Sequence, residues 1–508
     1  MAIRSTRPPR RARRTVLWGL LAVVVLALLG VVAGALLWSG ITLGGDATAL
    51  ARVEVQPFGG KLERVRAFGP GGQRIPLAVR SGHLTPRTLL TPGETVSVQA
   101  VVRRPSWLGW ALGSERHVQQ TIRAPVANVT ERWVTVPAGS AVQVRFDRPV
   151  SAVGYGRLGR RAFDRPRNSL ALARRSPAGT VAVAAAPRSW ERLGRPVAVS
   201  WFPHAGLPVA LADPAPGARL APATPIRLTF SAPVADVLAG SDPRLSPRTP
   251  GRWSRPDSHT LLFVPSGFGA PFDSNLRLDL GRAVAVTAGS DLRTTRRIDW
   301  TVPPGSTLRL QQLLAQAGYL PLDWTAAGGA VARTPQAELQ AAVDPPQGHF
   351  SWRYPNTPSE LQALWSEGDW NQITRGAVMM FQDTHGLTVD AIPGAQVWHA
   401  LLADAIAGKR RDSGYSYVYV HSSVPQSLTL WHNGQTVLTS PGNTGVPAAP
   451  TQHGSFPVFE HIPVGTMSGT NPDGSHYHDP GIRWISYFNG GDAIHAFTRA
   501  SFGTPQSL

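Results

Sequence analysis

The pattern of apolar and polar positions divides the chain into long stretches of strand and one stretch of helix. Between residues 48 and 126, short runs alternate apolar and polar residues, as in Val53-Glu-Val-Gln and Val96-Ser-Val-Gln-Ala-Val-Val, and turn residues separate the runs. Period-2 alternation is typical of strands with one buried face. The pattern therefore predicts an all-β module over residues 48–126.

A repeated pattern follows this module. Residues 141–153 and 225–237 share an apolar spacing and the proline that follows it, 84 residues apart. An offset of this size suits one β-sandwich per repeat. The two segments resemble bacterial immunoglobulin-like domains, which act as spacers; a ligand-binding sandwich is the alternative, although no polar cluster demands it. The matched positions expected to face the core are Val142, Val144, Phe146, Ile226, Leu228 and Phe230.

Residues 304–410 change to helical spacing. Leu310, Leu313 and Leu314 begin an i, i+3, i+4 stripe. Thr357-Pro-Ser-Glu supplies the cap, the first-position proline and the third-position acid that begin a second helix. With the later apolar stripes, the spacing predicts a small three-helix core.

Residues 376–398 resemble the peptidoglycan-binding-like repeat. A helix ending in Phe381-Gln leads to a Gly-Leu turn, then to Val-Asp and a last helix that opens before Trp398, and Ala391 replaces the family's usual glycine. The resemblance implies binding of glycan, whereas the apolar stripes by themselves indicate only helix packing. Residues 323–356 form a long insertion between the helices, and the sequence assigns no structure to them.

Residues 414–508 return to strand patterns, and their motifs resemble the L,D-transpeptidase (YkuD-like) catalytic domain over about 95 residues. That family has a hairpin with Asn-Gly at its turn, a Thr-Gly turn, a Thr-Pro-x-Gly-x-Phe segment, a strand ending in Ile-His-Gly and a Ser-x-Gly-Cys loop. The matches, in the same order, are Asn433-Gly434, Thr444-Gly445, Thr451 to Phe456, and Ile494-His495. The resemblance implies an acyltransferase that cross-links peptidoglycan.

The resemblance also assigns roles to individual residues. The family's nucleophile is a cysteine, and the imidazole that activates its thiol maps onto His495. Ala496 stands where a glycine is usual, and Ser507 maps onto the serine of the Ser-x-Gly-Cys loop. Tyr477 and Tyr487 are candidates for lining the substrate cleft, with ordinary packing as the alternative.

In this family, a thiolate attacks the carbonyl before the terminal D-Ala of one stem peptide, and an amine of a second stem resolves the thioester into a 3→3 cross-link. His476 and His478 beside Asp479 are only a weak metal signal, because no third ligand follows at a fixed spacing. Neither a metal nor a cofactor is expected.

The chain contains no cysteine. As given, it is expected to be inactive as a transpeptidase. One explanation is that the chain is a fragment that stops just before the nucleophile; the alternative is a non-catalytic wall-binding pseudoenzyme. A Gly-Cys directly after Leu508 would indicate the fragment.

The positive charge behind the net +19 comes almost entirely from arginine. A preference for arginine over lysine can simply reflect a GC-rich genome, but the positive surface would still attract polyanions. An anionic cell wall or membrane surface fits such a charge. Nucleic acid does not, since no basic run interleaved with aromatic residues appears outside the N-terminus. The expected partners are peptidoglycan stem peptides, glycan and a membrane.

The N-terminal residues carry the pattern that predicts contact with a membrane. Residues 16–38 are uncharged and apolar, with Trp18 and Trp38 near the ends and six arginines before them. Length and charge predict a single-pass anchor with a cytoplasmic N-terminus and the bulk of the chain outside. A cleaved signal peptide is the alternative, but its apolar region is usually shorter.

The predicted fold class is therefore multidomain and mainly β, with one transmembrane helix. The expected segments are a basic tail (1–14), a transmembrane anchor (15–39), a β module (48–126), two immunoglobulin-like sandwiches (127–204 and 212–303), a peptidoglycan-binding-like helical domain (304–410) and an incomplete L,D-transpeptidase domain (414–508).

Overall fold

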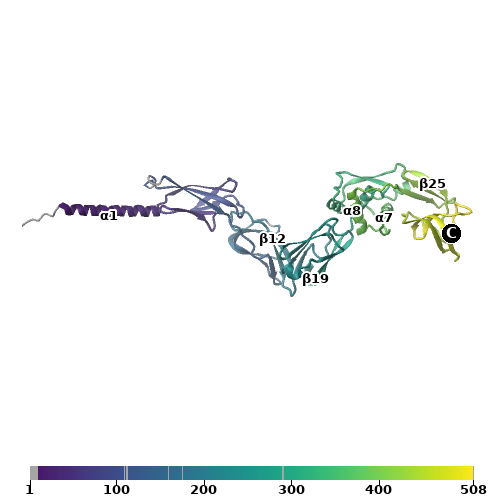
Figure 1. Ribbon diagram of the computed structural model, residues 1–508, viewed down its shortest axis with the longest axis horizontal. Helices are drawn as coiled ribbons and strands as arrows, with labels where there is room; N and C mark the ends of the chain where they lie inside the picture. Colours follow the sequence, from purple (N-terminus) through teal and green to yellow (C-terminus); the bar gives the residue numbers. More distant parts are fainter. Residues whose placement is uncertain are drawn as a thin grey trace, which may run out of the picture. The chain divides into compact units, whose positions relative to one another are not determined.

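The computed structural model describes residues 10–506, except 108, 110–112, 158, 174–175 and 289–290 (Figure 1). The chain divides into two compact units, Met1–His204 and Ala205–Leu508. Most regular structure in both units is strand, as the sequence predicts.

The prediction of a transmembrane anchor is wrong. Helix α1 spans Arg10–Leu37, but no helix in the described part of the chain is both long and apolar enough to cross a membrane. The transmembrane part of the predicted fold class and the predicted single-pass localisation are overturned.

The first β module has two four-stranded sheets around one core. The strands are β1 (Ile41–Gly45), β2 (Ala51–Val55), β6 (His83–Pro86) and β5 (Leu77–Arg80) in one sheet, and β4 (Arg74–Ile75), β3 (Lys61–Phe68), β7 (Thr95–Arg103) and β8 (Glu115–Arg123) in the other. Val96, Val98 and Val102 alternate along β7 and are fully buried. The period-2 pattern of this stretch therefore predicts its core correctly.

The first repeat forms one five-stranded sheet. Its strands are β9 (Trp133–Val136), β10 (Val142–Tyr155), β11 (Arg161–Leu172), β12 (Gly179–Ala186) and β13 (Val197–Pro203). Trp190, in the loop after β12, packs into the core of the preceding module and donates its indole N–H to the Thr48 carbonyl at 3.0 Å. The two β modules of this unit therefore share an anchoring side chain.

The second repeat forms a seven-stranded sheet. Its elements are β14 (Val209–Asp213), β15 (Ile226–Phe230), α3 (Val234–Leu238), β16 (Arg244–Ser246), β17 (Gly251–Asp257), β18 (Thr260–Pro265), β19 (Ser274–Ala288) and β20 (Asp291–Val302). All six matched side chains of the repeats are at most 5% exposed. Their inward orientation is confirmed, while the sandwich form of each repeat stays a prediction.

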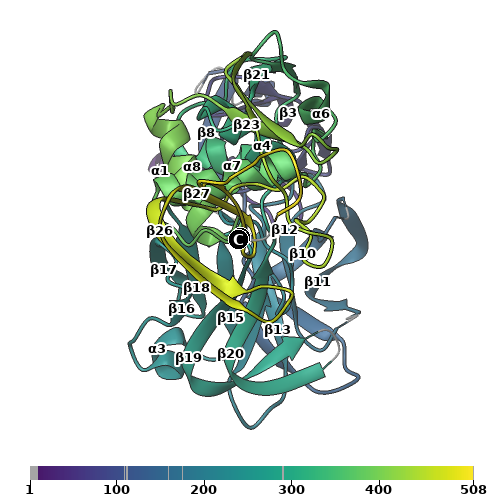
Figure 2. The ribbon, with the colours of Figure 1, turned by 90° about the vertical axis from the view of Figure 1, so that its right-hand side faces the viewer.

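The helical region contains more than the expected three helices. Its elements are α4 (Thr307–Gln316), β21 (Leu322–Ala326), α5 (Pro335–Val343), β22 (Gly348–Trp352), α6 (Ser359–Gln362), α7 (Gln372–Thr384) and α8 (Ala395–Ala407). Helices α4, α7 and α8 pack together around Leu313, Phe381 and Trp398 (Figure 2). The insertion that the sequence left unassigned supplies most of the antiparallel β21–β22 pair and the helix α5 between the two strands.

The second predicted helix is a single turn. Helix α6 has four residues and is capped by Pro358 rather than Thr357. The Thr357 hydroxyl instead donates to the Tyr354 carbonyl at 2.8 Å, and so it closes the preceding turn. The capping pattern located the start of this helix within one residue, but it did not predict that the helix stops after one turn.

The C-terminal region has two three-stranded antiparallel sheets. They are β23 (Ser416–His421), β24 (Ser427–His432) and β25 (Gln435–Pro441), and β26 (Glu460–Thr470), β27 (His476–Asn489) and β28 (Asp492–Ala496). Asn433 and Gly434 both have positive φ, at 47° and 89°, which confirms the predicted hairpin turn. Trp431 joins the core of the helical region, so the first of these sheets is fixed to the helices.

Candidate functional site

His495 lies near the end of β28, next to an irregularity in its partner strand. Ile494 pairs with Ser486 and Ala496 pairs with Arg483, so β27 carries an extra residue opposite His495. Within this bulge, Trp484 has a φ of +58° and is 69% exposed. Bulges re-aim side chains and are common beside active sites. The strand pairing therefore gives His495 an orientation that a regular ladder would not.

The surroundings of the His495 imidazole favour its neutral form. Its Nδ1 atom is buried and has no hydrogen-bond partner among the described residues. Burial lowers its pKa below the ordinary value, the backbone at Ala496 and the carboxylate of Asp479 oppose this shift, and Arg499 adds to it. Because the neutral form can accept a proton at neutral pH, this is the state that a general base needs.

The segment that follows β28 is held by a buried glutamine. Gln426 is 3% exposed, and its backbone N–H donates to the Gly503 carbonyl at 2.7 Å. Its side-chain amide donates to the Thr444 hydroxyl at 2.8 Å and accepts from the Thr444 N–H at 2.8 Å. The Gln506 N–H in turn donates to the Thr444 carbonyl at 2.8 Å. Gln426 thus links the segment after His495 to the Thr444-Gly445 turn.

Asn443 provides a second link between the same two segments. Its side-chain oxygen accepts from the Gly503 N–H at 2.9 Å, and its amide donates to the Ser501 carbonyl at 3.2 Å. The chain beyond His495 therefore has a defined path up to Gln506.

Two of the matched motifs meet at Gly445. Its N–H donates to the Thr451 hydroxyl at 2.9 Å. A side chain at this position would collide with the Ala449 carbonyl, so the turn requires glycine. The Thr-Gly turn and the segment beginning at Thr451, which are separate motifs in the sequence, form one loop structure.

The two tyrosine candidates occupy different parts of β27. Tyr487 pairs with Ala493, which lies two residues before His495 on β28 and so has the same strand parity. Tyr477 pairs with Gly469 near the opposite end of β27. Both rings pack against the small core of this sheet, which is the alternative that the sequence left open.

The remaining candidates are placed as follows. Ala496 is exposed at the end of β28, and Ser507 lies outside the described residues. His476 accepts or donates a hydrogen bond with the Thr470 hydroxyl at 3.1 Å. Within the described residues, no group of three His, Cys, Asp or Glu side chains lies close enough to hold a metal ion.

Gln426 and Asn443 are the residues that sequence reasoning missed. Both are polar and lie outside the motifs that carry the resemblance. Asn443 stands directly before Thr444-Gly445, a position at which a turn-capping role could have been considered. Gln426 follows a proline at the start of a strand, and no local signal indicates that it is buried.

Comparisons with known proteins find similar proteins only among solved structures, at low sequence identity. No family model matches this chain, and no curated protein matches it either. Among solved structures, it is similar to an L,D-transpeptidase from Mycobacterium smegmatis at 13% identity and a TM-score of 0.15, covering 58% of this chain and 84% of that one. An L,D-transpeptidase from Mycobacterium tuberculosis H37Rv matches at 12% identity and a TM-score of 0.14, with the same coverage.

A third structure is of a different kind. The Bacteroides ovatus mixed-linkage glucan utilization protein SGBP-B, in complex with a mixed-linkage heptasaccharide, matches at 12% identity and a TM-score of 0.17, covering 52% of this chain and 68% of that one. TM-scores this low carry no functional argument, so the function is argued below from the residues of this chain.

Proposed function

We propose that the two C-terminal sheets form the base-bearing part of an L,D-transpeptidase site that acts on peptidoglycan stem peptides. The observation that carries the proposal is the His495 imidazole, which is kept neutral by burial and has a free Nδ1. The hydrogen bonds of Gln426 and Asn443 add support, because they hold residues 501–506, which directly precede the position that maps onto the start of the family's Ser-x-Gly-Cys loop.

The chemistry divides between His495 and a thiol. His495 accepts the thiol proton, and the thiolate forms a bond to the carbonyl carbon that precedes the terminal D-Ala. The C–N bond to D-Ala breaks, and the imidazolium returns the proton to the leaving amine. The amine of a second stem peptide then attacks the thioester, the C–S bond breaks, and the thiol is restored. The chain has no cysteine, so its own residues supply the base but not the nucleophile.

The test compares this protein with a version carrying Gly-Cys appended after Leu508, the place that the family's Ser-x-Gly-Cys loop gives to the thiol. Each is mixed with a tetrapeptide muropeptide, and free D-Ala and 3→3 dimers are measured by mass spectrometry. We expect turnover only with the appended cysteine, because losing the nucleophile costs on the order of 10⁶ in rate.

The matched variants are His495→Ala and His461→Ala in the cysteine-bearing version. His461 is an exposed histidine on β26 whose ring contacts the Ser486 hydroxyl at 3.1 Å. We expect His495→Ala to lower the rate roughly 10²–10⁴-fold and His461→Ala to leave it unchanged. Turnover by the unmodified protein, or full activity of His495→Ala, would show that the assignment is wrong.

A non-catalytic wall-binding protein is the second candidate, favoured by the absence of cysteine from the sequence. It predicts muropeptide binding without D-Ala release even when the cysteine is appended. It also predicts that His495→Ala leaves binding unchanged. The helical region is proposed to contribute contacts to glycan, a proposal that rests on its resemblance to the peptidoglycan-binding-like repeat.

A further inference from the structure

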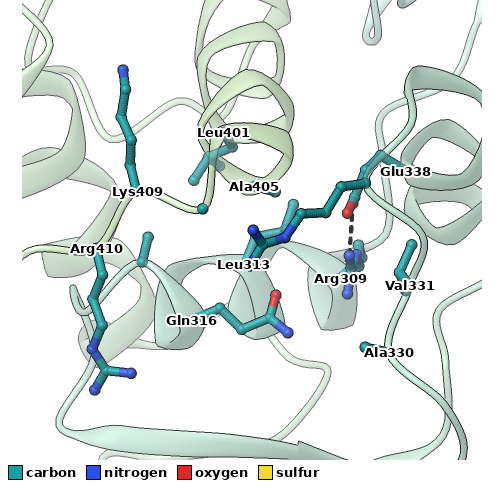
Figure 3. Close-up of a pocket in the computed structure, with 13 residues that line it drawn as sticks. Arg309, Leu313, Gln316, Ala330, Val331, Glu338, Leu401, Ala405, Lys409 and Arg410 are labelled. Carbon is teal, nitrogen blue, oxygen red and sulfur yellow. Dashed lines mark hydrogen bonds and ion pairs between the residues drawn. The ribbon is translucent and has the colours of Figure 1, made fainter.

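A separate cavity lies within the helical region, and its residues are not those of the His495 site. It has a volume of about 310 Å³ and lies between α4, the C-terminal end of α8 and the insertion that carries α5 (Figure 3). Aliphatic side chains form part of its wall, among them Leu313, Leu401, Ala405 and Val331. The volume is that of a small ligand site.

Four cationic side chains line this cavity against a single carboxylate, that of Glu338. The carboxylate is already neutralised, because Arg309 donates to it at 2.7 Å and both side chains are almost fully buried. Arg309 also donates to the Gln312 side chain at 3.1 Å. Its Nε atom remains buried without a partner among the described residues, which leaves an unused donor beside the cavity.

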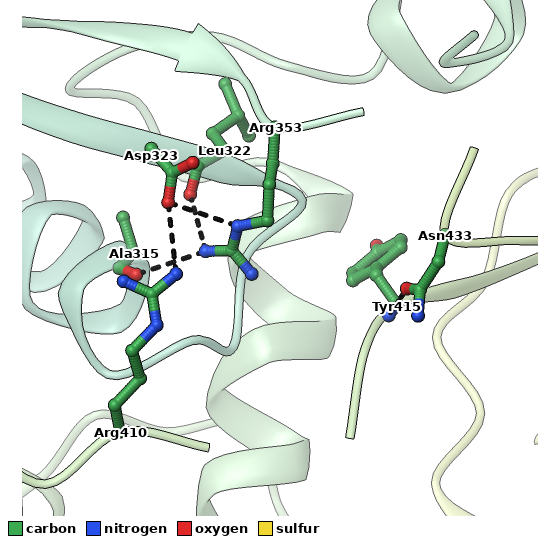
Figure 4. A network of polar contacts seen from close by, with 7 residues as sticks. All are labelled: Ala315, Leu322, Asp323, Arg353, Arg410, Tyr415 and Asn433. Atoms are coloured by element: carbon green, nitrogen blue, oxygen red, sulfur yellow. Dashed lines mark hydrogen bonds and ion pairs between the residues drawn. The ribbon is translucent and has the colours of Figure 1, made fainter. Parts of the chain in front are cut away.

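Two other cations of the lining are held by carboxylates outside it. Lys409 pairs with Asp404 at 2.9 Å. Arg410 pairs with Asp323 at 3.3 Å, and Asp323 also accepts from Arg353 at 3.1 Å (Figure 4). These contacts hold Lys409 and Arg410 beside the cavity, but Asp323 is shared between Arg410 and Arg353 and so balances only one of these two charges.

Arg333 is the fourth cation of the lining. It lies in the insertion, is exposed, and has no carboxylate partner within the described residues. Its guanidinium atoms lie 2.9–3.2 Å from the place where a Cβ on Gly408 would stand. Gly408 has a φ of +67° and caps α8. Glycine at the helix end thus leaves room for Arg333 to lie over the cavity, where the partial negative charge of the helix C-terminus favours a cation.

We propose that this cavity binds a small aliphatic carboxylate, such as the free C-terminal end of an alanine-terminated peptide. Arg333 offers a guanidinium without a carboxylate partner among the described residues, and a guanidinium pairs well with the two oxygens of a carboxylate. The aliphatic wall suits short side chains rather than a hydrated phosphate. The insertion at 323–356 therefore has a binding role, because it supplies both Arg333 and Glu338.

The proposal is tested on the full chain by saturation-transfer NMR with N-acetyl-alanine as the probe. N-acetyl-alaninamide, which lacks the charge, and inorganic phosphate, which lacks the aliphatic group, are the comparison ligands. We expect binding of N-acetyl-alanine and at least about tenfold weaker binding of the amide, since hydrogen bonds to charged groups are the strong ones. Equal binding of the amide, or tighter binding of phosphate, would overturn the proposal.

Two variants locate the binding. Arg333→Gln is expected to weaken the affinity for N-acetyl-alanine about tenfold, whereas Arg375→Gln removes an exposed arginine from α7 outside the cavity and should have no effect. Ala405→Leu narrows the cavity without changing charge and should weaken binding in the same assay. Thermal unfolding checks that each variant is folded. Unchanged binding in Arg333→Gln and Ala405→Leu would contradict the assignment of the ligand to this cavity.

Discussion

His495 is half-buried and Glu191 is fully buried, and burial shifts the pKa values of the two side chains in opposite directions. For His495 it lowers the pKa. For Glu191 it raises the pKa from 4.5 to about 7, only partly opposed by the Arg188 backbone and nearby arginines. One oxygen of Glu191 accepts from the Arg188 N–H at 2.9 Å, and the other is buried without a partner among the described residues. In both cases the folded protein favours the neutral form.

The first prediction concerns the charges around His495. Arg499 lowers the pKa of His495 and Asp479 raises it, so Arg499→Gln should raise that pKa toward its ordinary value and Asp479→Asn should lower it further. NMR titration of the imidazole protons measures both, with the unfolded protein as the reference. Shifts of the opposite sign would show that these residues do not act on His495 as described.

The second prediction concerns stability and Glu191. Between about pH 4.5 and 7, the folded state binds more protons at Glu191 than the unfolded state does, so the free energy of unfolding should fall as pH rises through this range. Glu191→Gln keeps a neutral side chain and should raise stability at pH 8 by on the order of 1–3 kcal/mol. Denaturant unfolding at pH 5 and pH 8 measures this effect. A pH profile of the variant that matches the unmodified protein would contradict it.

For individual residues, the sequence predicts the burial of side chains that follow an apolar–polar alternation. It misses side chains whose roles depend on contacts with distant parts of the chain. Val144 and Leu228 were assigned to the core from alternation, and both are fully buried. Gln426 and Arg333 gain their roles from partners 18 and 75 residues away, Thr444 and Gly408. No local pattern encodes such pairings, and for His495 only its motif, not its free Nδ1, is visible in the sequence.

Among the elements, β24 connects the strand and helix regions. Trp431 is 4% exposed, its ring lies edge-on to Tyr354 at 5.5 Å, and its indole N–H donates to the Asn356 carbonyl at 2.9 Å. The backbone N–H of Tyr415, just before β23, donates to the side-chain oxygen of Asn433 at 2.8 Å (Figure 4). The Asn433 side chain at the turn thus holds the start of β23, and the packing of Trp431 holds β24 on the helical core.

The third prediction tests this connection. Trp431→Ala should cost about 3–5 kcal/mol, because it removes a large ring from the core. Trp431→Phe keeps an aromatic ring and should cost about 1–2 kcal/mol, mainly through the lost hydrogen bond to Asn356. Hydrogen exchange followed by mass spectrometry should show faster exchange in both β23–β25 and α4. Equal losses in the two variants would show that the ring itself contributes little.

Element types were predicted where a strong local signal exists. The Asn433-Gly434 turn was found because both positions need positive φ, which these residues adopt readily. The length of helix α6 was not predicted, since a capping signal marks where a helix begins and not where it ends. The antiparallel β21–β22 pair was left unassigned although both strands alternate apolar and polar residues, because each strand is only five residues long and α5 separates them. Side chains of this pair pack on the helical core.

For the whole molecule, composition and hydropathy were the least dependable guides. The apolar run before residue 39 predicted an anchor, yet no helix in the described residues meets the length and hydropathy that a membrane crossing needs. The chain divides into compact units between His204 and Ala205, where one of the expected segments also ends. The finer boundaries expected at 126, 212, 303 and 410 remain proposals.

The last prediction is that the two units respond separately to substitution. Glu191 lies in the unit Met1–His204 and Trp431 in the unit Ala205–Leu508, and each side chain packs within its own unit. Substitutions at distant sites without shared partners act independently. At pH 8, Glu191→Gln should therefore slow hydrogen exchange only in peptides from β1–β13, whereas Trp431→Ala should speed exchange only in peptides from β14–β28. If either variant changed exchange in both sets of peptides, the two units would be energetically coupled, and a substitution in one unit would alter the stability of the other.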